Sequence, residues 1–191
     1  RGSIEPWGLA EVLSVIFDYV DDFSLECQGI AAWLASSSCG ARPDGKDRIK
    51  VGWKELGSCG GLVVTRRELV SIPCNLSRLV CLAKASFASN QLTSLPDSLA
   101  TLPMLRELDL SGNKFRDIPS CVFRIARLAK LWLARNQISK VPSDVKGLAG
   151  GLELLDLSRN KITSLPMEMS SLRRLKKLNL IHNLLDSLPK K

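Results

Sequence analysis

A repeat of 23 residues constrains the fold of this chain more than any other sequence feature. The stretch from Leu105 to Pro119, LRELDLSGNKFRDIP, fits the pattern L-x-x-L-x-L-x-x-N-x-(apolar)-x-x-(apolar)-P, and its asparagine recurs in steps of 23, 23, 24 and 23 residues. Apolar-proline pairs keep the same spacing, so that six of the nine prolines belong to the repeat. Two independent markers with a common period predict a solenoid of stacked coils. The recurring asparagines are Asn90, Asn113, Asn136, Asn160 and Asn183.

Each coil carries the signals of one short strand and one turn. Leu108 and Leu110 alternate with Glu107, Asp109 and Ser111, which is the period-two pattern of a half-buried strand. The asparagine follows where the chain must turn, and its amide can both donate hydrogen bonds to the backbone and accept them. The proline then fixes one backbone torsion of the return. One coil cannot bury its own leucines, so neighbouring coils must supply the core.

This pattern resembles the leucine-rich repeats of intracellular signalling and scaffold proteins, in the subclass with a Leu-Pro pair on the outer side. The resemblance covers residues 59–191 and implies about six repeats, the first degenerate and the last incomplete. The implied fold is an α/β solenoid with a curved parallel sheet of about six short strands and loose convex returns. Arg67 takes the asparagine position of the first repeat and has only donors, so we expect the asparagine ladder to begin at Asn90. One residue is added around Gly147–Gly151, where we expect a flexible return.

Residues 1–58 lack the period and differ in charge from the rest of the chain. They hold six basic and nine acidic residues, whereas residues 59–191 hold 21 basic and ten acidic residues. Apolar residues recur there at intervals of three and four, which predicts an amphipathic helix in a small helical unit. One interpretation is a cap that shields the first repeat. The residues that carry this pattern are Leu9, Val12, Leu13, Ile16, Phe17 and Val20.

A second interpretation of residues 1–33 is functional. The segment from Leu9 to Trp33 resembles an F-box, the helical motif that docks substrate receptors onto the Skp-type adaptor of cullin-type ubiquitin ligases. The resemblance implies that the same six apolar residues contact the adaptor and that the repeats select a substrate. Ala10 departs from the motif, which usually has proline there, and Gly29-Ile30 replaces the usual Val-Cys. The cap and the F-box both remain open.

Binding residues are expected on strand positions that point away from the core, because adjacent coils stack those side chains about 4.8 Å apart. The centre of this concave face is Trp132, between Asp109 and Asp156. An exposed tryptophan is a frequent interface anchor, and flanking carboxylates can receive a Lys or Arg of a partner. Alternatively, Trp132 only shields neighbouring leucines. Further candidates on this face are Glu107, Lys130, Lys177, Asn179, Arg135 and Arg159.

The sequence contains no motif of a phosphate-binding loop, a zinc protease or a serine hydrolase. A single histidine argues against a His-containing zinc site, and six cysteines without a C-x-x-C pair favour reduced thiols in the cytoplasm or nucleus. No apolar run reaches the roughly 18 residues of a transmembrane helix. The basic cluster at residues 173–177 has no interleaved aromatic residues, which disfavours a nucleic-acid partner. We therefore predict a non-enzymatic protein without cofactor that binds a protein partner.

The F-box interpretation predicts that the double change Ile16→Asp and Phe17→Asp abolishes binding to a Skp-type adaptor, because it places two charges on an apolar docking face. Isothermal titration calorimetry measures the binding, and circular dichroism verifies that the fold is retained. Trp132→Ala, on the repeats, should leave adaptor binding unchanged. If the unchanged chain gives no heat with the adaptor, the F-box interpretation is wrong and the cap remains.

Overall fold

The computed structural model describes residues 49–52, 60–80 and 82–186. The predicted helical unit and its F-box-like residues lie outside this part, except for residues 49–52, and stay predictions.

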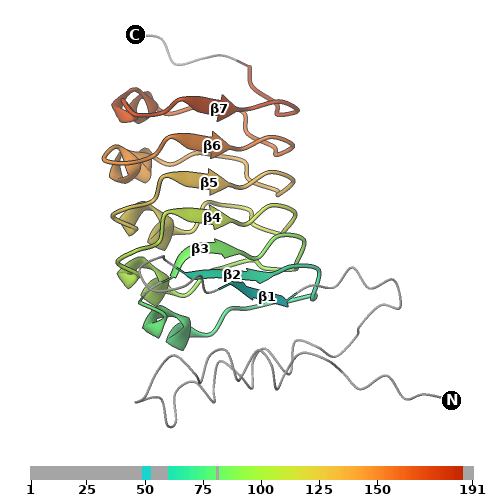
Figure 1. Ribbon diagram of the computed structural model, residues 1–191. Coiled ribbons are helices and arrows are strands. Elements are labelled where there is room, and N and C mark those ends of the chain that lie inside the picture. The colour runs from blue at the N-terminus through green and yellow to red at the C-terminus, as the bar shows by residue number, and fades with distance from the viewer. Residues whose placement is uncertain (1–48, 53–59, 81, 187–191) are drawn as a thin grey trace, which may run out of the picture.

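Six parallel strands stack in chain order, one from each coil (Figure 1). Each strand pairs with the next so that equivalent repeat positions lie side by side, as in the series Lys84, Glu107 and Lys130. This arrangement confirms the predicted solenoid with a parallel sheet. The strands are β2 (Gly60–Val64), β3 (Leu82–Ser86), β4 (Glu107–Asp109), β5 (Lys130–Trp132), β6 (Leu154–Asp156) and β7 (Lys177–Asn179).

A seventh strand, β1 (Ile49–Gly52), was not predicted from the sequence. It pairs with β2 in the antiparallel direction, with Ile49 opposite Val64 and Gly52 opposite Gly61. Two of its four residues are β-branched, which suits a strand. An unpaired sheet edge exposes N–H and C=O groups to other chains. β1 covers this edge at the start of the parallel sheet.

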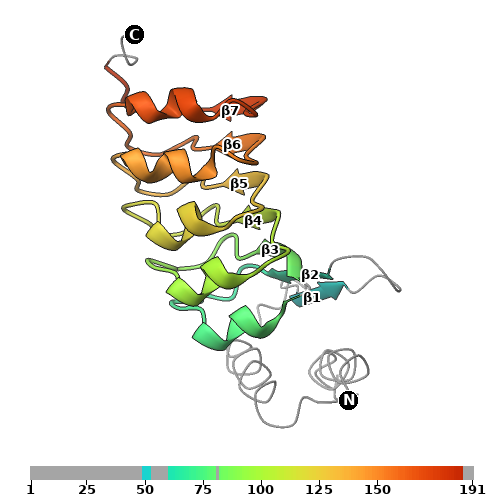
Figure 2. The same cartoon turned by 90° about the vertical axis from the view of Figure 1, so that its left-hand side faces the viewer.

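The convex side carries a short 3-10 helix in each of five returns (Figure 2). Each helix follows the proline of an apolar-proline pair; Pro119, for example, has a φ of −58° and its carbonyl accepts a hydrogen bond from the Val122 N–H at 3.0 Å. Proline suits this position because its fixed torsion matches the start of a helix and its missing N–H is not needed there. The returns are thus more regular than the loose segments expected. The helices are η1 (Cys74–Arg78), η2 (Asp97–Thr101), η3 (Ser120–Arg124), η4 (Ser143–Leu148) and η5 (Met167–Ser171).

The added residue near Gly147 lengthens η4, which has six residues where the other four 3-10 helices have five. Gly147 lies inside this helix, and a Cβ there would collide with the carbonyl oxygen of Phe123 in the preceding coil. Gly147 is therefore not the flexible position that was expected. Glycine is needed there because the backbones of neighbouring coils approach closely.

The core lies between the sheet and the 3-10 helices and is almost wholly aliphatic. In the coil that defines the repeat, the three pattern leucines and Phe115 are fully buried. Leucines of successive coils meet in one continuous cluster, which is how stacked coils bury what one coil cannot. The three leucines are Leu105, Leu108 and Leu110.

The asparagines tie each coil to the one before it. Asn136 Nδ2 donates hydrogen bonds to the Leu110 and Leu133 carbonyls, both at 3.0 Å, and its Oδ1 accepts one from the Phe115 N–H at 3.1 Å. Corresponding bonds form at the other four positions. Asn90 accepts from the Arg67 and Leu69 N–H groups, so its bonds reach into the degenerate first coil.

Asn136→Ala should lower the free energy of unfolding by about 3 kcal/mol, because it leaves buried backbone groups of Leu110, Leu133 and Phe115 without partners. Urea denaturation followed by circular dichroism measures the change.

The matched control is Asn183→Ala. Asn183 makes the same bonds but is only half-buried, so water can replace its amide and the loss should be smaller. If Asn183→Ala and Asn136→Ala lower the free energy of unfolding equally, burial does not set the contribution of these asparagines.

Candidate functional site

The sheet face that points away from the core, here called the concave face, consists of outward side chains arranged in rows across the parallel strands. The pairing register sets each outward residue beside its counterpart on the next coil. We define the central row as Val63, Ser86, Asp109, Trp132, Asp156 and Asn179. We define the lysine row as Gly61, Lys84, Glu107, Lys130, Leu154 and Lys177.

The middle of the central row brings together the three residues singled out from the sequence. Trp132 on β5 pairs in register with Asp109 on β4 and with Asp156 on β6. All three are half-buried. With strands about 4.8 Å apart, the two carboxylates flank the indole and lie about 10 Å from each other.

The two carboxylates are held in place by hydrogen bonds. Asp109 Oδ1 accepts from the Ser111 N–H at 2.9 Å, and its Oδ2 accepts from Ser86 Oγ at 3.2 Å. Asp156 Oδ1 accepts from the Ser158 N–H at 2.9 Å. Within the described part of the chain, neither aspartate forms an ion pair. Their negative charges are therefore fixed in orientation and not neutralised by a neighbouring side chain.

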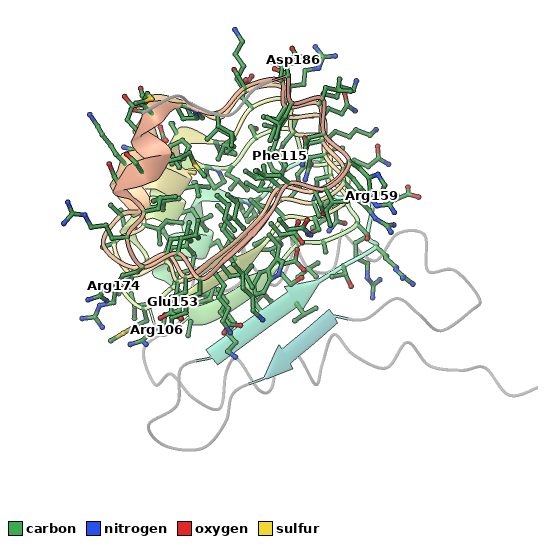
Figure 3. The ribbon with its side chains drawn as sticks, turned by 90° about the horizontal axis from the view of Figure 1, so that it is seen from above. Arg106, Phe115, Glu153, Arg159, Arg174 and Asp186 are labelled. Carbon is green, nitrogen blue, oxygen red and sulfur yellow. The ribbon has the colours of Figure 1, made fainter. Side chains whose placement is uncertain are left out.

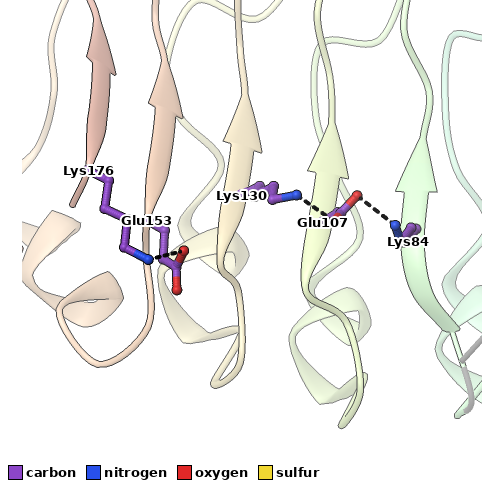
Figure 4. Close-up of polar contacts among 5 residues, drawn as sticks. All are labelled: Lys84, Glu107, Lys130, Glu153 and Lys176. Carbon is purple, nitrogen blue, oxygen red and sulfur yellow. Dashed lines mark hydrogen bonds and ion pairs between the residues drawn. The ribbon is translucent and has the colours of Figure 1, made fainter. Parts of the chain in front are cut away.

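The lysine row, in contrast, contains a counter-ion for two of its three lysines. Glu107 Oε2 lies 3.3 Å from Lys84 Nζ, and Glu107 Oε1 lies 2.9 Å from Lys130 Nζ (Figure 4). Beside this row, Lys176 Nζ lies 2.9 Å from Glu153 Oε2. Glu107 and Lys130, both predicted to contact a partner, thus already pair with each other. This pairing was not predicted from the sequence, although the repeat spacing aligns Lys84, Glu107 and Lys130.

The charges of these lysines shift the pKa values of their glutamates. Burial alone would raise the pKa of Glu107, but the hydrogen bonds and positive charges of Lys130 and Lys84 outweigh burial and hold this pKa below its usual value. The hydrogen bond from Lys176 likewise lowers the pKa of Glu153.

Arg135 and Arg159 lie at the edge of the concave face where the strands end. Each directly precedes a ladder asparagine, is exposed, and has a left-handed backbone with a φ of 56° or 55°. Figure 3 shows Arg159 at this edge and Arg106 and Arg174 at the opposite edge, where the strands begin. Lys177 and Asn179 lie together on β7, and Asn179 Oδ1 accepts a hydrogen bond from the Ile181 N–H at 3.2 Å.

Away from the concave face, an open pocket of about 760 Å³ lies between the asparagine turns and the 3-10 helices. Among residues 49–52, 60–80 and 82–186, no group of three His, Cys, Asp or Glu residues could hold a metal ion. Cys74 and Cys121 are free thiols, and burial raises the pKa of Cys121. No helix in the part described is long and apolar enough to cross a membrane. The pocket is lined by Thr93, Ser94, Leu95, Asp97, Lys114, Arg116, Asp117, Ile118, Pro119, Ser120 and Gln137.

Two family models match the chain, and both describe a leucine-rich repeat. One covers residues 126–185 and the other covers residues 104–124. No curated protein matches the chain at a significant level.

Similar solved structures include three receptors, two of which are plant receptors. The plant peptide hormone receptor RGFR1 in complex with RGF2 is 29% identical, with a TM-score of 0.55 over 63% of this chain and 19% of the receptor chain. The ectodomain of the receptor kinase GASSHO1/SCHENGEN3 from Arabidopsis thaliana, in complex with CASPARIAN STRIP INTEGRITY FACTOR 2, is 29% identical, with a TM-score of 0.56 over 67% of this chain and 16% of that chain. A TDR receptor is 29% identical, with a TM-score of 0.52 over 59% of this chain and 20% of the receptor chain. The matched region is thus a fifth or less of each receptor chain.

The lowered pKa of Glu107 predicts a pH dependence of stability. The folded protein binds a proton at Glu107 less readily than the unfolded chain does, so the two ion pairs stabilise the fold above the usual glutamate pKa of 4.5, and this contribution is lost as the pH falls through the lowered value. Glu107→Gln should lower the free energy of unfolding at neutral pH by less than about 1 kcal/mol, because the pairs are partly exposed.

Thermal denaturation followed by circular dichroism over a pH series checks this expectation. The difference between the unchanged chain and Glu107→Gln should disappear at acidic pH. Glu168→Gln serves as control, because Glu168 on η5 forms no ion pair within the described residues. If the difference in stability between the unchanged chain and Glu107→Gln persists at low pH, the pH dependence does not come from the ion pairs of Glu107.

Proposed function

Because this chain is a leucine-rich repeat protein, we propose that it is a scaffold or signalling module that holds a protein partner on its concave face, centred on Trp132. Leucine-rich repeat domains are protein–protein interaction modules, and solenoids of this kind bind partners on extended concave surfaces. The observation that carries the proposal is the in-register triplet of Asp109, Trp132 and Asp156.

Trp132 supplies the apolar contact of the proposed site. Trp132 is not part of the buried leucine core, and its side chain is partly exposed, so a part of the ring is left for a partner to cover. Interface energies concentrate on residues of this type near the centre of a contact. Trp132 lies on β5, with three parallel strands on one side and two on the other, which is a central position.

The flanking carboxylates define which side chain of the partner would meet the indole. Asp109 and Asp156 are oriented by hydrogen bonds before any partner arrives, so binding requires little further ordering of these groups. A Lys or Arg of the partner placed over Trp132 would gain a cation–π contact and an ion pair with one or both carboxylates. The partner therefore presents a basic residue at this point.

The similar receptor structures support a protein partner. Two of them are complexes, one with RGF2 and one with CASPARIAN STRIP INTEGRITY FACTOR 2. RGF2 and CASPARIAN STRIP INTEGRITY FACTOR 2 are bound by those receptors. For this chain we infer from them only that its partner is also a protein.

Trp132→Ala should reduce recovery of the partner at least about tenfold, because removal of a central aromatic anchor typically costs about 2 kcal/mol or more of binding free energy. The full chain is immobilised, partners are captured from cell lysate, and mass spectrometry quantifies each captured protein for the unchanged chain and the variant.

Met167→Ala is the matched control. Met167 is 54% exposed and lies on η5, on the convex side, so its loss should leave recovery unchanged. Urea denaturation must show that both variants remain folded. If Trp132→Ala captures the same proteins at the same level as the unchanged chain, the concave-face proposal is wrong.

A further inference from the structure

The residue before each turn asparagine, and its equivalent in the first coil, has a left-handed backbone in all six coils, with φ between 55° and 67°. A side chain in this conformation costs about 1–2 kcal/mol, whereas glycine adopts it freely. The third coil has Gly112 at this position, so glycine is compatible with it. The six residues are Arg66, Ser89, Gly112, Arg135, Arg159 and His182.

Arg135 and Arg159 occupy this position on consecutive coils. The Arg135 N–H donates to the Ser158 carbonyl at 2.9 Å, which fixes Arg135 beside the residue that precedes Arg159. Neighbouring coils are about 4.8 Å apart, so the two side chains start one strand spacing from each other. Both are exposed at the edge where the strands end, as Figure 3 shows for Arg159.

The surroundings of these arginines are basic. Lys161 follows Arg159 by two residues and is exposed as well. Within the described part of the chain, none of these three cations forms an ion pair. Asp156, at the end of the strand that leads to Arg159, instead accepts a hydrogen bond from the Ser158 N–H of its own coil. Three exposed positive charges therefore lie on these two coils without an ion-pair partner among the described residues.

The spacing favours one anion that bridges both guanidinium groups. A phosphorylated side chain carries a charge of about −1.5 to −2 and three acceptor oxygens, enough for two arginine forks at once. An extended acidic segment would present successive carboxylates on one face about 6.6–6.8 Å apart, which does not match adjacent coils about 4.8 Å apart. We propose that Arg135 and Arg159 bind a phosphorylated residue of the protein partner.

This inference rests on the proposed function, because the same partner would contact Trp132. Trp132 precedes Arg135 by three residues, about 10 Å along an extended chain. Residues two or three apart in an extended partner span about 7–10 Å. The partner segment would thus carry a Lys or Arg two or three residues from its phosphorylated residue.

The test uses the full chain and three pools of short degenerate peptides, with phosphoserine, serine or glutamate fixed at the centre. Recovered peptides are quantified by mass spectrometry. The phosphoserine pool should be recovered about tenfold more than the serine and glutamate pools, as expected for charge-assisted hydrogen bonds to two arginines. Equal recovery of the phosphoserine and glutamate pools, or of the phosphoserine and serine pools, overturns the proposal.

The decisive variant is Arg135→Gly with Arg159→Gly, because glycine suits the left-handed backbone and loss of binding cannot be ascribed to strain. It should recover the phosphoserine pool no better than the serine pool. Arg106→Gln with Arg174→Gln, two exposed arginines at the opposite edge, should keep the full preference. A preference that survives the glycine exchange, or is lost equally in the control, overturns the proposal.

The two proposals fail separately. Partner capture that is insensitive to Trp132→Ala refutes the central site, while a phosphoserine preference that depends on Arg135 and Arg159 still supports the anion site. Conversely, capture that depends on Trp132 with no phosphoserine preference refutes only the anion site.

Discussion

The hydrogen bonds of one asparagine per coil hold this structure in register. In each of the first four positions the amide is buried, with 6–8% of the residue exposed, and it joins carbonyls of two coils and an N–H of the earlier one. A strand pair as short as three residues, such as β4 with β5, has few hydrogen bonds of its own to fix its register. The asparagine supplies that constraint from outside the strand, at the turn, where backbone groups would otherwise be buried without partners.

The candidate site depends on this register. Asp109, Trp132 and Asp156 face the same side because each stands at the same distance from its asparagine. The one coil with an added residue tests how strict the arrangement is. The extra residue lengthens η4 on the convex side, and Trp132 still pairs with Asp156. The convex side thus accommodates the added residue while the register of the concave face is kept.

The period made most of the fold predictable, because both its markers are local in sequence. The asparagine recurs at five positions and the apolar-proline pair at six. What the period does not contain was missed: β1 lies outside the repeats, and the 3-10 helices depend on how the backbone packs after each proline. At the site, the sequence placed Glu107 and Lys130 on the correct face, but their ion pair depends on side-chain reach between neighbouring strands. The same holds for the hydrogen bond of Ser86 to Asp109.

The distribution of charge on the concave face constrains how a partner can lie. In the lysine row Glu107 pairs with Lys84 and Lys130 and the row stays positive, the central row carries two unpaired aspartates, and Arg135 and Arg159 line the strand-end edge. A partner surface of a single sign would be attracted by one of these rows and repelled by the next. On the proposed site, a segment with a basic residue over the central row and an anionic residue over Arg135 and Arg159 sets opposite charges against each other, whereas exchanging these two residues would set like charges against each other. We therefore expect the proposed site to select the order of charges in a partner segment as well as its composition.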